Sequence, residues 1–181
     1  MSSIVISGDT SGAITLAAPA VSGTNTATLP SATGTVMVSG NMPAFSAYSN
    51  ANQTLSSAVQ TKAQLQSKDF DTANAFDSTT NYRFTPQVAG YYQINGQAYC
   101  NGTALSYAWA AIFKNGGVYK IGSTYNGTAI SEFSSTVSSV VYLNGSTDYI
   151  ELYVTVTATS PKLIGGADFY TYLSGALVRA A

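Results

Sequence analysis

The chain has 181 residues, which is enough for one domain with a buried core and a short extension. Only 8% of its residues are charged, against roughly a quarter in an ordinary soluble protein. The formal net charge is −1 and the seven basic residues are scattered, so no basic stripe is available to bind phosphates, and we do not expect a nucleic-acid-binding protein.

Residues 1–42 differ from the rest of the chain because they contain no aromatic residue and a single charge, Asp9. Turn residues and prolines separate four predicted strands, at 4–6, 13–16, 24–29 and 35–38. So few residues cannot close a core of their own. We therefore expect this segment to stack against copies of itself or to attach to another protein, and a flexible linker is the alternative.

From Pro43 onward the sequence predicts one short strand after another and no helix of useful length. Turn signals separate these strands at five places, 101–102, 115–117, 126–127, 144–145 and 165–166. The cleanest alternation is in residues 149–156, where Ile150, Leu152, Val154 and Val156 share one face. The predicted fold class is all-β, an antiparallel β-sandwich.

Two strands carry aromatic residues on both faces. In residues 90–100, Tyr92, Ile94, Ala98 and Cys100 point one way, and the opposite face carries further tyrosines. The C-terminal strand, predicted over Asp168–Val178, repeats the pattern, with Phe169, Leu173 and Leu177 expected inward. A sheet with two apolar faces usually buries both, and the second partner can be another chain. We predict a homotrimer with an interface formed by six outward tyrosines, Tyr91, Tyr99, Tyr149, Tyr153, Tyr170 and Tyr172.

A family resemblance agrees with this pattern. Its motifs occur in order: Phe-Thr-Pro (84–86), Ala-Gly-Tyr-Tyr (89–92), Lys-Asn-Gly (114–116), Tyr-Leu-Asn-Gly (142–145) and Tyr-Ile-Glu-Leu-Tyr-Val (149–154). From about Pro43 to Val178 the chain resembles the globular head of complement C1q, which shares a jelly-roll with the tumour-necrosis-factor superfamily. The resemblance implies a jelly-roll head, residues 43–181, that assembles as a trimer and binds another molecule.

Enzymatic chemistry is not expected. The chain has no histidine, and thus lacks the commonest general base and metal ligand. The single cysteine, Cys100, is predicted to be a core residue, and Trp109 is also expected in the core. A glycosidase needs two carboxyl groups at one cleft, and nothing in the sequence places any two of Glu132, Asp148 and Glu151 together.

No cofactor is predicted, and calcium is the one metal considered. Asp69, Asp71 and Asp77 are close in the sequence, and some members of the resembling family hold calcium. Because their spacing matches no known calcium loop, a solvated acidic loop is the favoured interpretation.

Three loops were considered for binding a partner, at 101–106, 122–130 and 160–167. They are rich in small polar residues and tyrosine, as binding loops often are. Tyr107 and Tyr125 are the predicted aromatic anchors, and Lys162 is a predicted contact to acidic surface glycans. The alternative is that these are plain hairpin loops.

Residues 8–36 resemble a segment found in phage tail-fibre and other virion proteins. No run of about twenty apolar residues is present to span a membrane, and the N-terminus lacks the features of a secretory signal. The function expected is therefore a non-enzymatic bacteriophage virion protein: a short fibre, tail tip or head decoration. It would assemble in the host cytoplasm, attach to other virion proteins through residues 1–42 and bind a glycan or protein on the host surface. A bacterial secreted or surface binding module of the same fold is the alternative, followed by a carbohydrate-active enzyme.

Overall fold

The computed structural model describes residues 3–7, 10–17, 20–21, 23–26, 31, 36–38, 40 and 42–181. The chain divides into two compact units, Met1–Thr35 and Val36–Ala181. The boundary that the sequence predicted between residues 42 and 43 concerns folding of the head in isolation and stays a prediction.

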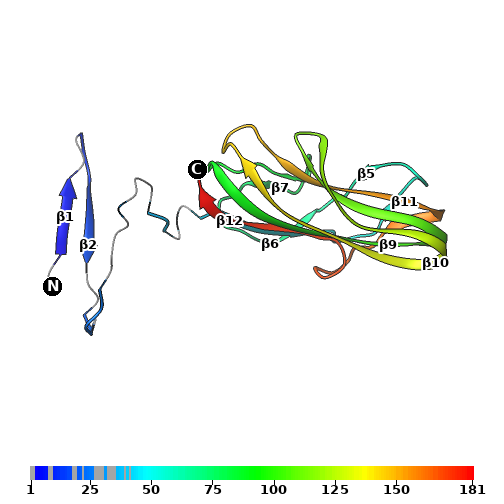
Figure 1. The fold of residues 1–181 in the computed structure, drawn as a ribbon, viewed down its shortest axis with the longest axis horizontal. Helices are drawn as coiled ribbons and strands as arrows, with labels where there is room; N and C mark the ends of the chain where they lie inside the picture. Colours follow the sequence, from blue (N-terminus) through cyan, green and yellow to red (C-terminus); the bar gives the residue numbers. More distant parts are fainter. Residues whose placement is uncertain are drawn as a thin grey trace. The chain divides into compact units, whose positions relative to one another are not determined.

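The N-terminal unit contains one hairpin, formed by β1 (Ser3–Ser7) and β2 (Ala13–Ala17) in antiparallel register (Figure 1). Ile4 is 66% exposed and Ile14 is 68% exposed. A two-stranded ribbon with exposed apolar residues cannot bury them by itself. The other two predicted strands of this region are not confirmed: residues 24–26 and 36–38 are not in strands, and residues 27–29 and 35 lie outside the described residues.

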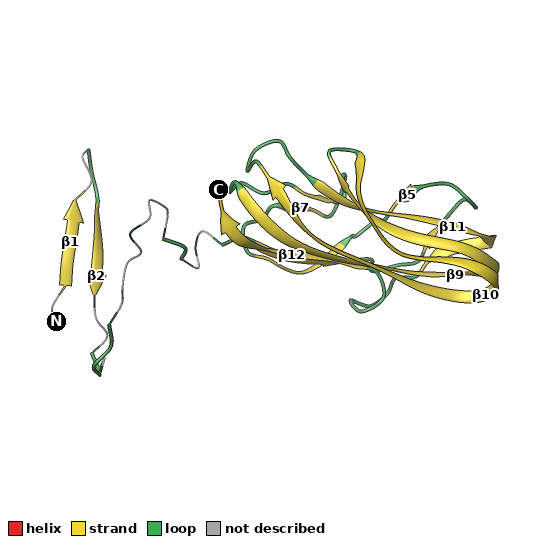
Figure 2. Cartoon of the chain, in the orientation of Figure 1, coloured by secondary structure: helices red, strands yellow, loops and turns green. Residues whose placement is uncertain are grey.

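The second unit is built from strands, and no α-helix occurs among the described residues (Figure 2). Its strands are β3 (Ala44–Tyr48), β4 (Gln53–Thr54), β5 (Thr61–Lys62), β6 (Ser67–Asp71), β7 (Phe76–Asp77), β8 (Arg83–Phe84), β9 (Gly90–Lys114), β10 (Gly117–Leu143), β11 (Ile150–Leu163) and β12 (Tyr172–Ala180). In the part of the chain that is described, no helix has the length and hydropathy needed to cross a bilayer.

The long strand β9 belongs to both layers of the sandwich. Its first part, residues 90–97, pairs with β12, and its second part, residues 100–114, pairs with β11. The partner β10 follows β9 along its whole length. We call β6, β3, β12, residues 90–100 of β9 and residues 132–143 of β10 the first layer. The remaining parts of β9 and β10, with β11, β8 and β7, form the second layer.

The core lies between the two layers. Tyr92, Ile94, Ala98 and Cys100 are fully buried, as the alternation predicted, and Ile150, Leu152, Val154 and Val156 oppose them from β11. Gly96 allows close packing, because a Cβ there would lie 3.0 Å from the Leu152 side chain of the opposite layer. Burial of the Cys100 thiol raises its pKa to about 12, so it is an unreactive core residue.

Two expectations about side-chain placement are wrong. Phe169 was expected inward, but it is 63% exposed because β12 begins only at Tyr172. Trp109 was expected in the core, but it is only half-buried, since its neighbours Ala108 and Ala110 occupy the inward positions of β9.

The strands turn the corner between layers through bulges, where we had expected loops. Residues 101–106 and 122–130 lie within β9 and β10, and residues 160–163 lie within β11. The register shifts between Asn126 and Glu132 and between Thr157 and Lys162. A bulge inserts unpaired residues and bends a strand, which serves the same purpose here as a loop.

Candidate functional site

The outward side of the first layer is the surface richest in aromatic residues, and we call it the tyrosine face. Its four neighbouring strands are aligned so that outward residues form rows. One row runs Tyr48, Tyr172, Gln97 and Thr136, and the next runs Ser46, Ser174, Asn95 and Ser138. A continuous surface of this kind can make close contact with another copy of the protein.

The centre of the tyrosine face is polar, and its groups satisfy one another. Gln93 Nε2 donates to Asn95 Oδ1 at 3.2 Å and to Ser138 Oγ at 2.9 Å, and Ser138 donates to Asn95 at 2.8 Å. Such a closed network can be buried without leaving unpaired donors or acceptors. The polar residues at the centre can therefore be buried between two copies at little cost. The apolar residues around them would provide the driving force for association.

One end of the face carries an aromatic pair from β9 and β10. The rings of Tyr91 and Tyr142 lie 5.4 Å apart, and the two residues are 43% and 41% exposed. The Lys114 ammonium lies 5.8 Å from the Tyr142 ring centre and donates to the Tyr142 carbonyl at 2.8 Å. The pair is thus held in place while much of its surface remains open.

The other end of the face carries a second aromatic cluster. Tyr99 stacks on Tyr170 at 5.4 Å, and the exposed Phe169 packs against Tyr170 at 4.4 Å. The Tyr99 hydroxyl donates to the Glu132 carboxylate, and this bond, together with burial, raises the pKa of Tyr99 above its ordinary value. A hydroxyl engaged in this way stays protonated and fixes the ring.

Tyr91, Tyr99, Tyr170 and Tyr172 lie on or beside this face, but two of the six predicted interface tyrosines do not. Tyr153 stacks on Phe113 at 4.0 Å in the second layer, and Tyr149 lies under the Arg83 guanidinium at 4.3 Å. Because a cyclic trimer joins two different patches of each copy, the interface role of Tyr149 and Tyr153 stays a prediction that the tyrosine face does not test. The sequence reasoning missed Tyr142, although its outward position in the alternation of residues 137–143 was available as a signal.

The predicted receptor-binding residues do not form one cluster. Tyr107 pairs with Asn126 and Thr157, whereas Lys162 pairs with Asn101, and about 20 Å of strand separates positions 101 and 107. Tyr125 packs against the core and lies 5.4 Å from the Phe133 ring, and its hydroxyl donates to the Thr128 carbonyl. Its ring is partly buried against the edge of the core, and its role as a receptor anchor stays a prediction.

The corner of the sandwich nonetheless lies opposite the termini of the second unit. Gly90 pairs with Ala180, and Leu177 donates its N–H to the Pro43 carbonyl at 2.9 Å, so both termini lie at one end. Asn101, eleven residues further along β9, is roughly 35 Å away and pairs with Glu132 and Lys162. Figure 1 shows β9, β10 and β11 bending together at this end.

The three aspartates considered for calcium do not converge. Asp69 accepts from Ser46 Oγ at 2.7 Å, and Asp71 pairs with Lys68 at 3.1 Å. Burial opposes ionisation of Asp71, but the N–H groups of residues 75 and 76, together with Lys68, hold its pKa below the ordinary value. The Asp77 carboxylate accepts a hydrogen bond from Thr80 N–H within its own turn. No group of three or more possible metal ligands occurs among the described residues.

The acidic residues weighed for glycosidase chemistry are also separate. Glu151 is buried against Lys62 at 2.6 Å, Asp148 pairs with Lys114 at 2.8 Å, and Glu132 lies beside Tyr99. Hydrolysis of a glycoside needs two carboxyl groups across one cleft. These three each have a structural partner in a different part of the sandwich.

No family model matches the chain, and no curated protein matches its sequence. Solved structures do match its fold. The globular domain of zebrafish complement 1qA protein is 17% identical with a TM-score of 0.52, covering 77% of this chain and 98% of its own. Murine APRIL is 11% identical with a TM-score of 0.57, covering 76% of this chain and 99% of its own.

The tumour-necrosis-factor protein Eiger from S. frugiperda is 12% identical with a TM-score of 0.54, covering 77% of this chain and 93% of its own. At these identities the likeness concerns the fold. The second unit thus has the C1q/tumour-necrosis-factor-like jelly-roll, as the sequence motifs implied.

Proposed function

We propose that this protein is a non-enzymatic binding protein that functions as a homotrimer, with the tyrosine face as the contact between copies. The observation that carries the proposal is the apolar surface exposed on this face by Tyr91, Tyr142 and Phe169, with Val140 beside them. Fully burying each such side chain contributes about 1.5–3 kcal/mol before side-chain ordering is subtracted. A monomer would leave this surface in water, which is unusual for so large an aromatic group.

The proposed biological role is that of a bacteriophage virion protein: a short fibre, tail tip or head decoration. Two features support it. Residues 8–36 resemble segments of phage tail-fibre and other virion proteins, and the β1–β2 hairpin exposes Ile4, Val5, Ile6, Ile14 and Leu16. Apolar residues on an isolated ribbon favour attachment to another protein or to copies of itself. In this role residues 1–42 attach to the particle, and the protein is located in the virion.

The proposed host-binding surface is the corner of the sandwich opposite the termini. Lys162, which pairs with Asn101, is the side chain there that we propose as a contact to a glycan or protein of the host. Tyr107, about 20 Å of strand further along β9, is proposed as a second, separate contact. Support comes from position alone: a head attached to a particle through its N-terminus leaves the opposite end free.

Light scattering of interface variants tests the assembly. The double variant Tyr91→Ser/Tyr142→Ser should shift the protein from trimer to monomer at micromolar concentration. Its matched control is Val118→Ser/Ile121→Ser, which removes exposed apolar residues of β10 in the second layer. If the control dissociates the protein and the tyrosine variant does not, the contact lies on the other layer.

Particle composition tests the biological role. We expect mass spectrometry to detect the protein in purified phage particles. We also expect a chain lacking residues 1–42 to be absent from particles assembled with it. Secretion of the protein by a bacterium with no phage genes adjacent to its gene would instead favour the bacterial binding module.

A further inference from the structure

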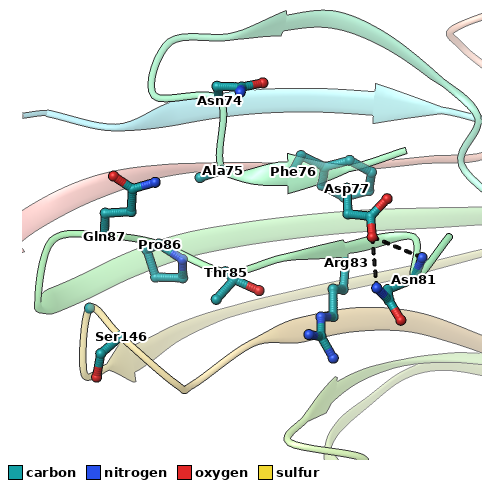
Figure 3. Close-up of a pocket in the computed structure, with 11 residues that line it drawn as sticks. Asn74, Ala75, Phe76, Asp77, Asn81, Arg83, Thr85, Pro86, Gln87 and Ser146 are labelled. Carbon is teal, nitrogen blue, oxygen red and sulfur yellow. Dashed lines mark hydrogen bonds between the residues drawn. The ribbon is translucent and has the colours of Figure 1, made fainter. Parts of the chain in front are cut away.

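A polar cleft of about 570 Å³ opens between β7, β8 and the loop around Ser146 (Figure 3). This volume is within the range of sites that bind small molecules. The side chains that matter for its chemistry are Arg83, Thr85, Asn81, Gln87 and Ser146. The cleft lies in the second layer and at the end opposite the corner proposed for host binding, so it is separate from both proposed contact surfaces.

Arg83 is the only cation that lines this cleft. Its guanidinium carbon lies 4.3 Å from the centre of the Tyr149 ring, which holds the planar group in one orientation. The three ion pairs of the described residues use Lys62, Lys68 and Lys114. Within this part of the chain, the Arg83 guanidinium donates no hydrogen bond, so its donors are available to a ligand.

The one acid of the cleft, Asp77, is already committed to its own turn. Its two oxygens accept hydrogen bonds from Thr79 N–H and hydroxyl, Thr80 N–H, and Asn81 N–H and side-chain amide, at 2.7–3.1 Å. These bonds, led by those from the backbone, lower the pKa of Asp77 well below its ordinary value. Asp77 thus positions Asn81 beside Arg83, as Figure 3 shows, and its own lone pairs are occupied.

The rest of the wall consists of neutral groups that both donate and accept hydrogen bonds. Asn81 uses its amide nitrogen on Asp77 and keeps its carbonyl oxygen free, and the side chains of Gln87 and Thr85 have no partner within residues 42–181. Arg83 and Thr85 are two residues apart and project to the same side of the chain (Figure 3). Amides and hydroxyls of this kind match sugar hydroxyls, which also donate and accept.

We propose that this cleft binds a carboxylate-bearing saccharide of the uronic acid type. The guanidinium of Arg83 accommodates the carboxylate through two parallel hydrogen bonds, and Asn81 and Thr85, which flank Arg83 in the sequence, bind ring hydroxyls. Arg83 is one fixed cation with free donors, and the carboxylate of its cross-strand neighbour Asp77 is already occupied by hydrogen bonds of its own turn. With neutral groups around them, this arrangement fits one carboxylate among several hydroxyls. An acidic peptide, with several carboxylates, would leave all but one of them without a cation here.

Titration of the full chain with D-glucuronate, followed by calorimetry or by NMR, tests the proposal. D-glucose is the neutral probe of the same shape. We expect saturable glucuronate binding that is at least about tenfold tighter than glucose binding, because only glucuronate offers a carboxylate to Arg83. Equal binding of the two sugars, or no saturable glucuronate binding, would overturn the proposal.

The variant Arg83→Gln should weaken glucuronate binding by about tenfold or more and leave glucose binding nearly unchanged. Arg83→Lys keeps the charge but loses the planar group with its two parallel donors. Its affinity for glucuronate should therefore lie between those of the unmodified protein and of Arg83→Gln. Arg179→Gln is the matched control, because it removes the same charge from an exposed position of β12. An equal loss in the control would mean that overall charge, and not the cleft, attracts the sugar.

Thermal unfolding establishes whether each variant is folded. If Arg83→Gln unfolds, Thr85→Ala replaces it as the test, since the Thr85 side chain has no partner in residues 42–181 and its loss should not affect folding. This variant should weaken the binding of glucuronate and the binding of glucose to a similar extent. Unchanged affinity for both sugars in a folded Thr85→Ala protein would then contradict the proposed site.

Discussion

Ser135 is a buried polar residue whose role is to satisfy a bulge in the neighbouring strand. Trp109 pairs with Thr124 and Ala111 pairs with Ile121, which leaves Ala110 without a β10 partner. Ser135 Oγ accepts the Ala110 N–H at 2.8 Å and donates to the Ser123 carbonyl at 2.5 Å. The hydroxyl therefore joins the two layers at the edge where β10 passes between them.

The variant Ser135→Ala should lower the free energy of unfolding by about 1–3 kcal/mol, because it leaves a buried N–H unpaired. Denaturant titration measures this change. The neighbouring Ser134→Ala is the control, since Ser134 is exposed and should change stability by less than about 0.5 kcal/mol. Equal changes in the free energy of unfolding for the two variants would show that the hydrogen bond to Ala110 does not contribute to stability.

Acid stability depends on aspartates whose pKa is lowered in the folded protein. The pKa values of Asp71, Asp77 and Asp148 all lie below the ordinary value of 3.8. A lowered pKa stabilises the fold above the unfolded value, and this contribution disappears as the pH falls toward the folded value. We expect the unfolding temperature to be nearly constant from neutral pH to about pH 5 and to fall steeply below about pH 4.

The variant Asp77→Asn should flatten this acid dependence and be less stable at neutral pH, because an amide cannot accept all the hydrogen bonds of residues 79–81. Thermal scans across the pH range provide the measurement. Asp69→Asn is the comparison, since Asp69 accepts a single bond from Ser46. An unchanged pH profile in Asp77→Asn would contradict the assigned role of its carboxylate.

At the scale of a strand, β10 packs its first half against its second half at Gly122. A Cβ at this position would lie 2.1 Å from the Thr136 carbonyl oxygen and 2.8 Å from Val137 Cβ. Gly122→Ala should therefore separate the two halves and cost about 1–3 kcal/mol of stability, measured by denaturant titration. Gly117→Ala on the same strand meets only an ordinary contact of 3.7 Å and should have a small effect.

The strands themselves could be predicted from alternation, as in residues 92–100 and 149–156. The turns could be predicted only in part. Asn115-Gly116 forms the expected hairpin, with φ of 53° and 78°, whereas Asn101-Gly102 lies inside β9. Turns and bulges use the same residues, so only long-range pairing with β11 decides which one forms. The cleft at Arg83 had no local signal either, because Tyr149 comes from a distant part of the chain.

At the scale of the whole molecule, the second unit should fold and assemble without the N-terminal hairpin. Among the described residues, the buried core residues lie between Phe45 and Leu177, and of residues 1–42 only the partly buried Met37 packs against them. A chain beginning at Pro43 should remain trimeric, with an unfolding temperature close to that of the full chain, as measured by light scattering and calorimetry. Aggregation or much earlier melting would show that residues 1–42 contribute to the core.

The central claim is that the tyrosine face is buried between copies of this chain, and the mass of the unmodified protein in solution tests it most directly. Sedimentation analysis of the full chain at micromolar concentration should give a single species of three times 18.7 kDa. The aromatic residues of the face should then be protected from surface labelling. A single species of 18.7 kDa with Tyr91 and Tyr142 freely labelled would contradict the claim.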